Sequence, residues 1–285
     1  IFITNNIMYS NTPNFIIAGV MKAGTTAAAF NLNKHPDIYM VTTYWKNKVL
    51  SHEQYNYAAQ TGSWAGSMGN KGNKELDYFN SDTNYNLSGS FDIYRSFFTR
   101  NLPAIGESSP NYFGLNEISN GGASSRIAND LPDAKVIILL RDPINRAYSH
   151  FNHIQEKNPS WGSYAYGKSF DTVAKNYSLS NIFQRSFYKD NLTTWLTDIG
   201  SDKIYVALQE NVAADPLAEY NKICTFLGIE HFDPIVNFDK IFTGNYSSEI
   251  EDSTIELLKP KFASDVAAIK DLYPSLDYSA WHDYS

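Results

Sequence analysis

Residues 15–30 read FIIAGVMKAGTTAAAF, and this stretch decides the fold. The apolar run ends at Gly19, a second glycine follows at Gly24, and two threonines lead into an alanine-rich segment. This order predicts a buried strand, a tight glycine loop and a helix, which is the outline of a phosphate-binding loop. The loop of nucleotide triphosphatases has its lysine directly after the last glycine. Here that position is Thr25, and the lysine is Lys22, inside the loop.

Strands and helices alternate along the rest of the chain. The apolar run at 134–143 predicts a central parallel strand covered on both faces, followed by a helix that begins at Pro143 with Asp142 as its cap. Further strands are expected at 14–19, 35–40, 104–113 and 203–208, and further helices at 25–33, 92–98, 124–131, 181–199, 216–227 and, with a break at Pro260, 249–272. The alternation predicts an α/β fold with a mostly parallel central sheet flanked by helices, and a P-loop-like nucleotide-binding core.

No linker or repeat divides the chain, so residues 1–285 are expected to form a single domain. Residues 42–73 differ from the rest because they are rich in Gly, Ser and Asn and show no apolar period. A long segment of this kind predicts an inserted loop or lid. The chain begins with Ile1 rather than Met, which suggests that it is processed, trimmed or cut from a longer polypeptide.

Composition excludes several classes of protein. The formal charge is −7, from 30 acidic and 23 basic residues, which argues against a nucleic-acid partner. The single cysteine, Cys224, excludes an intrachain disulfide framework and a Cys-based zinc site. The apolar runs are too short to span a bilayer, and the first residues lack the basic start of a secretory signal. We therefore expect a cytoplasmic protein with no membrane span.

A second anion site is predicted at 141–150, RDPINRAYSH. Arg141 follows the clearest strand, where ligands collect in open α/β sheets. Arg146, Ser149 and His150 share one helical face, and Arg141 and Ser149 are placed to hold a phosphate together. A capped helix with a surface Arg–Asp pair is the plainer alternative. Two anion sites at two strand ends indicate a nucleotide with two separate phosphates.

These two motifs together resemble the sulfotransferases that use 3′-phosphoadenosine 5′-phosphosulfate (PAPS). The segments KAGTT at 22–26, KELDYF at 74–79 and FTGNYSS at 242–248 are similar to family motifs. The resemblance implies PAPS as donor and adenosine 3′,5′-bisphosphate as product. It implies nucleotide-binding residues Lys22, Ala23, Gly24, Thr25, Thr26, Arg141, Ser149, Gly244, Asn245 and Tyr246.

The resemblance also implies a mechanism. Lys22 would stabilise the departing phosphate during in-line sulfuryl transfer, without a metal. The acceptor hydroxyl needs a general base, and the motif at 74–79 assigns this role to Glu75. His150 and His153 are rival bases because histidine titrates near neutrality.

The chain departs from the family pattern on the acceptor side. Ser108 stands where heparan-type enzymes have a substrate-contacting lysine, and Thr243 precedes Gly244 where lysine is usual. These changes and the acidic net charge argue against a glycosaminoglycan acceptor. The acceptor alcohol is left open between a small molecule, a glycan or lipid, and a hydroxyacyl group on a carrier protein. Two other functions stay open: a P-loop kinase, which would need a lysine at Thr25 and a magnesium-holding Asp, and a non-catalytic nucleotide-binding module.

Overall fold

The fold is built on a five-stranded sheet in the order β2-β3-β1-β4-β5. The computed structural model describes residues 12–41, 75–86, 88–114, 122–157, 162–176, 180–241 and 249–284. Its strands are β1 Phe15–Gly19, β2 Ile38–Met40, β3 Ala104–Ser108, β4 Lys135–Leu140 and β5 Ile204–Leu208. Every neighbouring pair is parallel. The predicted α/β fold with a parallel sheet is therefore confirmed.

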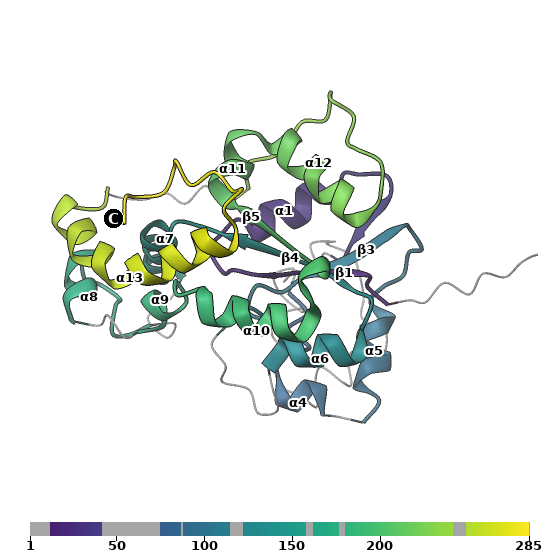
Figure 1. Cartoon of the computed structure of the whole chain (residues 1–285). Coiled ribbons are helices and arrows are strands. Elements are labelled where there is room, and N and C mark those ends of the chain that lie inside the picture. The colour runs from purple at the N-terminus through teal and green to yellow at the C-terminus, as the bar shows by residue number, and fades with distance from the viewer. Residues whose placement is uncertain are drawn as a thin grey trace, which may run out of the picture.

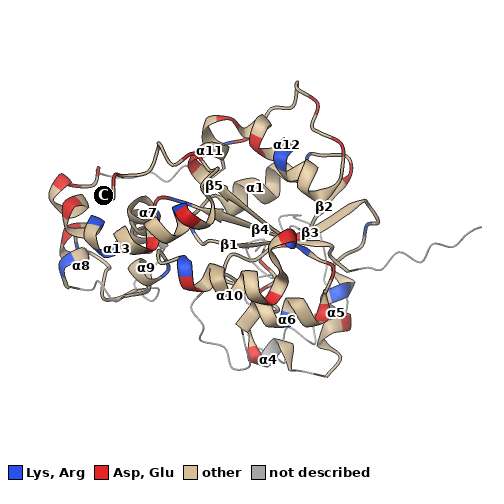
Figure 2. Cartoon of the chain, viewed as in Figure 1, with Lys and Arg blue, Asp and Glu red and all other residues tan. Residues whose placement is uncertain are grey.

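Helices lie on both sides of this sheet (Figure 1). One side holds α1 Thr25–Leu32, α11 Gln209–Ala214 and α12 Pro216–Leu227, and the other holds α4 Asp82–Tyr85, α5 Ser90–Ser96, α6 Gly122–Asp130 and α10 Lys189–Ile199. A third group packs together beyond β4 and consists of α7 Pro143–Lys157, α8 Phe170–Asn176, α9 Asn181–Gln184 and α13 Asp252–Leu272, and a 3-10 turn at Ser201–Lys203 precedes β5. Acidic and basic positions are mixed along these helices (Figure 2). No helix among the described ranges is long and apolar enough to cross a membrane.

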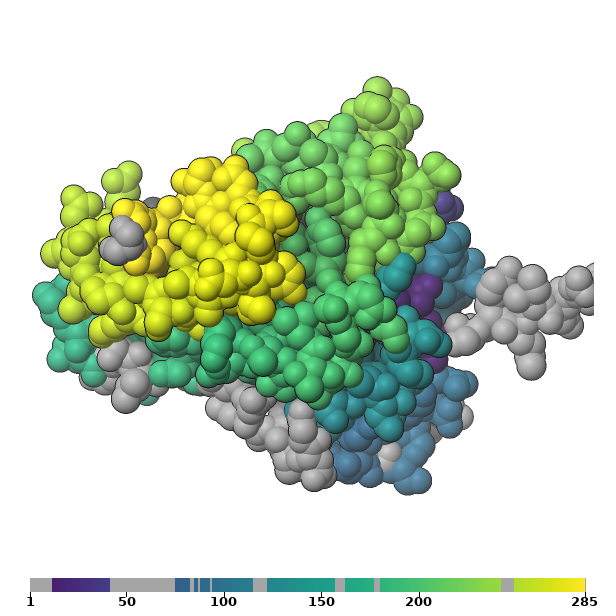
Figure 3. Space-filling view, viewed as in Figure 1, coloured from purple at the N-terminus to yellow at the C-terminus, as the bar shows by residue number. Residues whose placement is uncertain are grey.

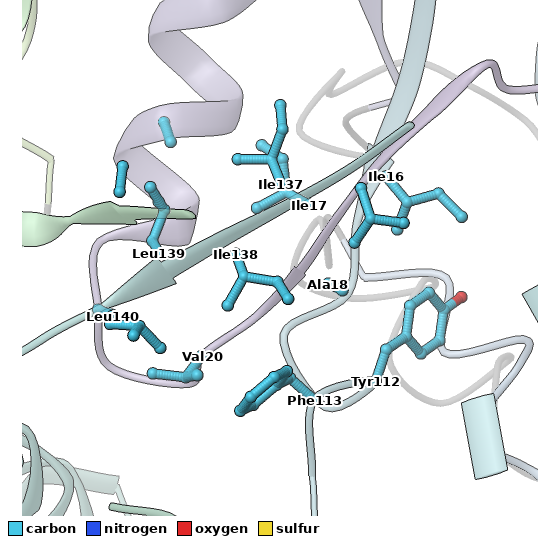
Figure 4. Close-up of a cluster of buried hydrophobic side chains, with 14 of the residues drawn as sticks. Ile16, Ile17, Ala18, Val20, Tyr112, Phe113, Ile137, Ile138, Leu139 and Leu140 are labelled. Carbon is cyan, nitrogen blue, oxygen red and sulfur yellow. The ribbon is translucent and has the colours of Figure 1, made fainter. Parts of the chain in front are cut away.

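The core centres on β1 and β4, whose apolar side chains fill both faces of the sheet (Figure 4). Their register pairs Ile16 with Val136 and Ile17 with Ile137. Continuous apolar runs are typical of parallel strands covered by helices on both faces, which explains why these two strands were predictable. The backbone at Gly19 passes so close to the turn after β3 that an added Cβ would lie 2.4 Å from the Cβ of Phe113.

The single helix expected at 181–199 is wrong, because the structure divides it into α9 and α10. The carboxylate of Asp265, on α13, accepts hydrogen bonds from the backbone amides of Tyr188 and Lys189 at 2.9 and 3.0 Å. These amides open α10, so a tertiary contact supplies a new helix start. Such a contact is invisible in the local sequence.

The break expected at Pro260 is also wrong, since α13 runs unbroken through this residue. A proline leaves the carbonyl four residues before it without its helical partner, and here that residue is Glu256. Both Pro260 and Glu256 are exposed, so water can satisfy the carbonyl. Buried Leu258 and Phe262 hold the helix against the core on either side of the proline.

Three short helices, α4, α8 and α11, were not predicted. The expected insertion at 42–73 lies outside the described residues. The expectation of a single domain over 1–285 stays a prediction.

Candidate active site

The loop between β1 and α1 reverses the chain direction within a few residues. Lys22 and Gly24 both have left-handed backbones, with φ of 74° and 80°, and α1 begins at Thr25 directly afterwards. The backbone amide of Ala23 donates to the carbonyl of Val20 at 3.0 Å, which closes the turn. The first amide groups of α1 have no partner within the helix, so this end of the sheet can bind an anion.

Arg141 joins the second predicted anion site to this loop. Its Nη1 donates to the carbonyl oxygen of Lys22 at 3.1 Å. Its Nε is buried and has no hydrogen-bond partner among the described residues. A guanidinium with one edge on the loop and an unused buried donor fits an anion at this place. The structure thus brings together Lys22 and Arg141, as the sequence predicted.

The turn that carries Arg141 is held by two acids, the buried Asp142 and the half-buried Glu210. Asp142 is fully buried, and its Oδ1 accepts from the amide of Asn145 at 2.9 Å, which confirms the predicted cap of α7. Its other oxygen accepts from the amide of His282 and from the hydroxyl of Tyr284, each at 2.9 Å. Glu210 Oε1 accepts from the Asp142 amide at 3.0 Å. In Figure 3 the C-terminal residues, in yellow, pack beside a green region of the chain, and the indole nitrogen of Trp281 donates to Glu210 Oε2 at 3.0 Å.

These contacts set the charge of the pair formed by Asp142 and His282. Burial opposes ionisation of Asp142, but His282 and the amide of Asn145 together lower its pKa. The carboxylate beside His282 raises the pKa of the imidazole, with 2.9 Å between Nδ1 and Oδ2. The acid is therefore ionised at neutral pH and holds the turn.

Helix α7 turns its predicted site residues into the interior. Arg146, Ser149 and His150 are all buried. Asp142, the acid of the alternative surface Arg–Asp pair, is also fully buried, so that pair does not lie at the surface. Arg146 is fully buried, donates Nε to the hydroxyl of Ser186 at 2.6 Å, and also donates to the carbonyl of Ile182. Its Nη1 reaches the carbonyl of Met21 at 3.3 Å. Arg146 therefore ties α7 and α9 to the loop after β1.

His150 lies in a cationic environment. Burial lowers its pKa well below the ordinary value, and the charges of Arg146, Arg185 and Lys22 act in the same direction. Its Nδ1 is buried and has no hydrogen-bond partner in the described part of the chain. The imidazole is therefore neutral at pH 7 and is a weaker base than an ordinary histidine.

The segment after residue 74 reaches the same edge of the sheet. The amides of Leu76 and Asp77 donate to Ser109 Oγ at 2.9 and 3.0 Å. Ser109 follows β3, and its own amide donates to the carbonyl of Ile17 in β1 at 3.2 Å. Because β1 and β3 are parallel neighbours, their carboxyl ends share an edge. Glu75, which is half-buried, thus lies at the edge that carries the loop of Lys22.

Sequence reasoning missed two charged residues of this region. Glu107, at the end of β3, is fully buried, and burial raises its pKa to about 7. Arg185 donates to Asn111 Oδ1 at 3.5 Å in the turn after β3. An acid after the apolar residues 104–106 was the available signal for Glu107. No local signal marks Arg185, because it reaches the site only through the break between α9 and α10.

The remaining predicted binding residues, Gly244, Asn245 and Tyr246, lie outside the described residues. Within the described ranges, no group of three or more His, Cys, Asp or Glu side chains is arranged to hold a metal ion. The expectation of a metal-free site stays a prediction.

Comparison with known proteins identifies the class that this fold and site define. Residues 13–234 match the profile of the sulfotransferase family, which covers more than half of the chain. The chain belongs to this family, and the kinase alternative is not favoured. The resemblance drawn from the two phosphate motifs is confirmed.

Individual relatives agree with this assignment. The human bifunctional heparan sulfate N-deacetylase/N-sulfotransferase 2 is 27% identical over 242 residues, with 77% of this chain and 22% of the relative covered. The mouse heparan sulfate glucosamine 3-O-sulfotransferase 3B1 is 25% identical over 224 residues, with 76% and 46% covered. The chain therefore spans between about a fifth and about half of the length of these curated relatives. The crystal structure of a sulfotransferase from Alicyclobacillus acidocaldarius superposes with a TM-score of 0.62 at 25% identity, with 95% of this chain and 98% of that chain covered.

Proposed function

We propose that this chain transfers the sulfuryl group of PAPS to an acceptor hydroxyl, and that the two anion sites hold the two ends of the donor. The contact between Arg141 and the carbonyl of Lys22 carries this proposal, because it makes the sites adjacent. Lys22 and residues 23–26 would bind the 5′-phosphosulfate. Arg141 and Ser149 would bind the 3′-phosphate, with Gly244, Asn245 and Tyr246 covering that side as the resemblance implies.

Lys22 is proposed to act electrostatically. Sulfuryl transfer builds negative charge on the bridging oxygen and the departing phosphate, and a preorganised cation at that oxygen stabilises the transition state. The left-handed backbone at Lys22 turns the chain back over the start of α1. The ammonium and the helix amides would then share one anion, and the chemistry would proceed without a bound metal.

Glu75 is proposed as the general base that removes the proton from the acceptor hydroxyl. It lies on the edge of the sheet that carries Lys22, and its half-buried carboxylate is reachable there. His150 is the weaker candidate because burial and neighbouring cations lower its pKa. His153 stays a rival, since it lies one helical turn further along α7.

The acceptor class is proposed to be less anionic than a glycosaminoglycan. Ser108, which replaces the lysine of heparan-type enzymes, is fully buried and cannot reach a substrate. A small alcohol, a glycan or lipid of low charge, and a carrier-bound hydroxyacyl group all fit. Screening these acceptors with sulfur-labelled PAPS separates them.

One experiment tests the assignment. Affinity for adenosine 3′,5′-bisphosphate and the transfer of labelled sulfate are measured for the wild type and for Lys22→Ala and Glu75→Gln. Loss of one preorganised donor reduces kcat by about 10²–10³-fold, and loss of a general base by about 10²–10⁴-fold. Lys261→Ala and Glu230→Gln change exposed residues of the same types and serve as matched controls.

Four results would contradict parts of this proposal. Binding without transfer to any acceptor supports a non-catalytic module, and magnesium-dependent ATP turnover supports a phosphotransferase. Full activity of Glu75→Gln moves the role of base to a histidine. Inhibition by a metal chelator would contradict the metal-free mechanism.

A further inference from the structure

Two hydroxyl groups hold the backbone that follows Glu75. Ser109 Oγ accepts from the amides of Leu76 and Asp77, at 2.9 and 3.0 Å. The hydroxyl of Tyr112 accepts from the amide of Tyr78 at 3.0 Å. Three consecutive amides are thus fixed by side chains of the turn after β3. Asp77 has a φ of 48°, so the chain bends sharply at this point and needs such support.

Both hydroxyls also donate a hydrogen bond to one carboxylate, that of Glu107. Ser109 Oγ donates to Oε2 at 2.7 Å, and the Tyr112 hydroxyl donates to Oε1 at 2.7 Å. A serine oxygen has two lone pairs and one hydrogen. Since two amides use both lone pairs of Ser109, its hydrogen must go to an acceptor, and Glu107 Oε2 is that acceptor.

Burial of the Glu107 carboxyl group at this place costs free energy. It is fully buried and forms no ion pair with a described Lys, Arg or His. Burying a carboxylate without a counter-charge is costly unless hydrogen bonds compensate. Two tyrosine hydroxyls and one serine hydroxyl provide that compensation, the third donor being Tyr94 at 3.0 Å from Oε1.

We infer that Glu107 is a positioning residue, which orients Glu75 by fixing the Ser109 and Tyr112 hydroxyls that hold residues 76–78. The inference rests on the proposed role of Glu75 as base. A base must lie within hydrogen-bond reach of the acceptor hydroxyl, and a displacement of about 1 Å at a reacting group costs on the order of 10²-fold in rate. Glu107 itself touches neither donor nor acceptor in this role.

Two tyrosines offer a matched pair of variants. Tyr112 and Tyr94 are both buried, and both donate to Glu107 Oε1. Only the Tyr112 hydroxyl also accepts from the backbone amide of Tyr78; the Tyr94 hydroxyl makes no such contact with the described residues of that segment. Tyr112→Phe and Tyr94→Phe each remove one hydroxyl from the same carboxylate oxygen and keep the ring.

The inference predicts different kinetics for the pair. Tyr112→Phe and Ser109→Ala should lower kcat by roughly 10- to 100-fold and leave the affinity for adenosine 3′,5′-bisphosphate unchanged. Tyr94→Phe should keep kcat within about 3-fold of the wild type. Equal losses of kcat in Tyr112→Phe and Tyr94→Phe would overturn the inference, because the carboxylate would then matter only for stability.

A double variant separates this inference from the role of Glu75. If Ser109 acts through Glu75, Ser109→Ala combined with Glu75→Gln should be no slower than Glu75→Gln alone. A further loss in the double variant would contradict action through Glu75. Full activity of Glu75→Gln would refute the proposed base. Whether Glu107 fixes the backbone of residues 76–78 can then still be measured directly.

Hydrogen exchange makes that direct measurement without any turnover. Glu107→Gln replaces one carboxylate oxygen by an NH2 group, which cannot accept a hydrogen bond. Either Ser109 or the two tyrosines then lose their acceptor, so the network loses at least one hydrogen bond. The amides of residues 76–78 should exchange at least 10-fold faster in Glu107→Gln and Ser109→Ala, and at the wild-type rate in Tyr94→Phe. Unchanged exchange in both Glu107→Gln and Ser109→Ala would overturn the inference.

Discussion

The guanidinium of Arg141 lies on the loop that carries Lys22, with 3.1 Å between Nη1 and the carbonyl oxygen of Lys22. This contact joins the ends of two adjacent strands, β1 and β4, which are separated by more than a hundred residues in the chain. The structure therefore places the two predicted anion sites side by side at one edge of the sheet. A substitution at the end of either strand should therefore alter anion binding at both sites.

Replacing Arg141 should weaken nucleotide binding. Loss of a hydrogen-bonded charged group costs about 1.5–3 kcal/mol, so Arg141→Ala should raise the Kd for adenosine 3′,5′-bisphosphate roughly 10- to 150-fold. Arg141→Lys should not restore the affinity, because an ammonium cannot contact the loop carbonyl and grip a phosphate as a planar fork does. Calorimetric titration at one ionic strength measures this, with exposed Arg95→Ala as control.

Gly19→Ala should destabilise the fold. The new Cβ would lie 2.4 Å from the Cβ of Phe113, and neither backbone can move without disturbing the sheet. Overpacking of this kind costs about 1–3 kcal/mol. The urea midpoint should therefore fall at an unchanged m-value. A wild-type midpoint would mean that the turn after β3 yields easily.

The free energy of unfolding should depend on pH through Glu107. Burial raises its pKa from 4.5 to about 7, so the folded protein binds a proton that the unfolded chain releases between these values. The resulting stabilisation is fully present below pH 4.5 and is lost as the pH rises to about 7. It amounts to on the order of 3 kcal/mol. Urea unfolding at several pH values should show this slope, and Glu107→Gln should reduce it.

Tyr284→Phe should loosen the turn behind Arg141. The variant removes a 2.9 Å hydrogen bond to the buried carboxylate of Asp142, worth about 1.5–3 kcal/mol for a charged acceptor. Thermal unfolding measures the loss of stability. Tyr166→Phe, on an exposed tyrosine, is the control and should unfold as the wild type does. Equal stability of both variants would show that Asp142 is held sufficiently by its other partners.

The sequence predicted the elements whose signal is local. The apolar runs of β1 and β4, the cap at Asp142 and the helix at 216–227 are read from neighbouring residues, and each is present. The positions of Lys22 and Arg141 follow from them, because both stand at strand ends. The division between α9 and α10 was missed because it depends on Asp265, far along the chain.

The supporting side chains of the site could not be read in the same way. A lone acid such as Glu107 is usually exposed, and only the fold reveals the three hydroxyls that point at its carboxylate. The predicted break at Pro260 was wrong although its reason is local. Proline does remove one helical hydrogen bond, but the carbonyl it leaves unpaired belongs to the exposed residue Glu256, where water can satisfy it.

The carboxylate of Asp142 meets residues that lie 140 and 142 positions later in the chain. During synthesis, the turn bearing Arg141 therefore leaves the ribosome long before these two supports exist. We expect nascent chains that end before His282 to bind adenosine 3′,5′-bisphosphate poorly even when the sheet has formed. Affinity for that nucleotide would then report how far translation and docking of residues 282–284 have progressed.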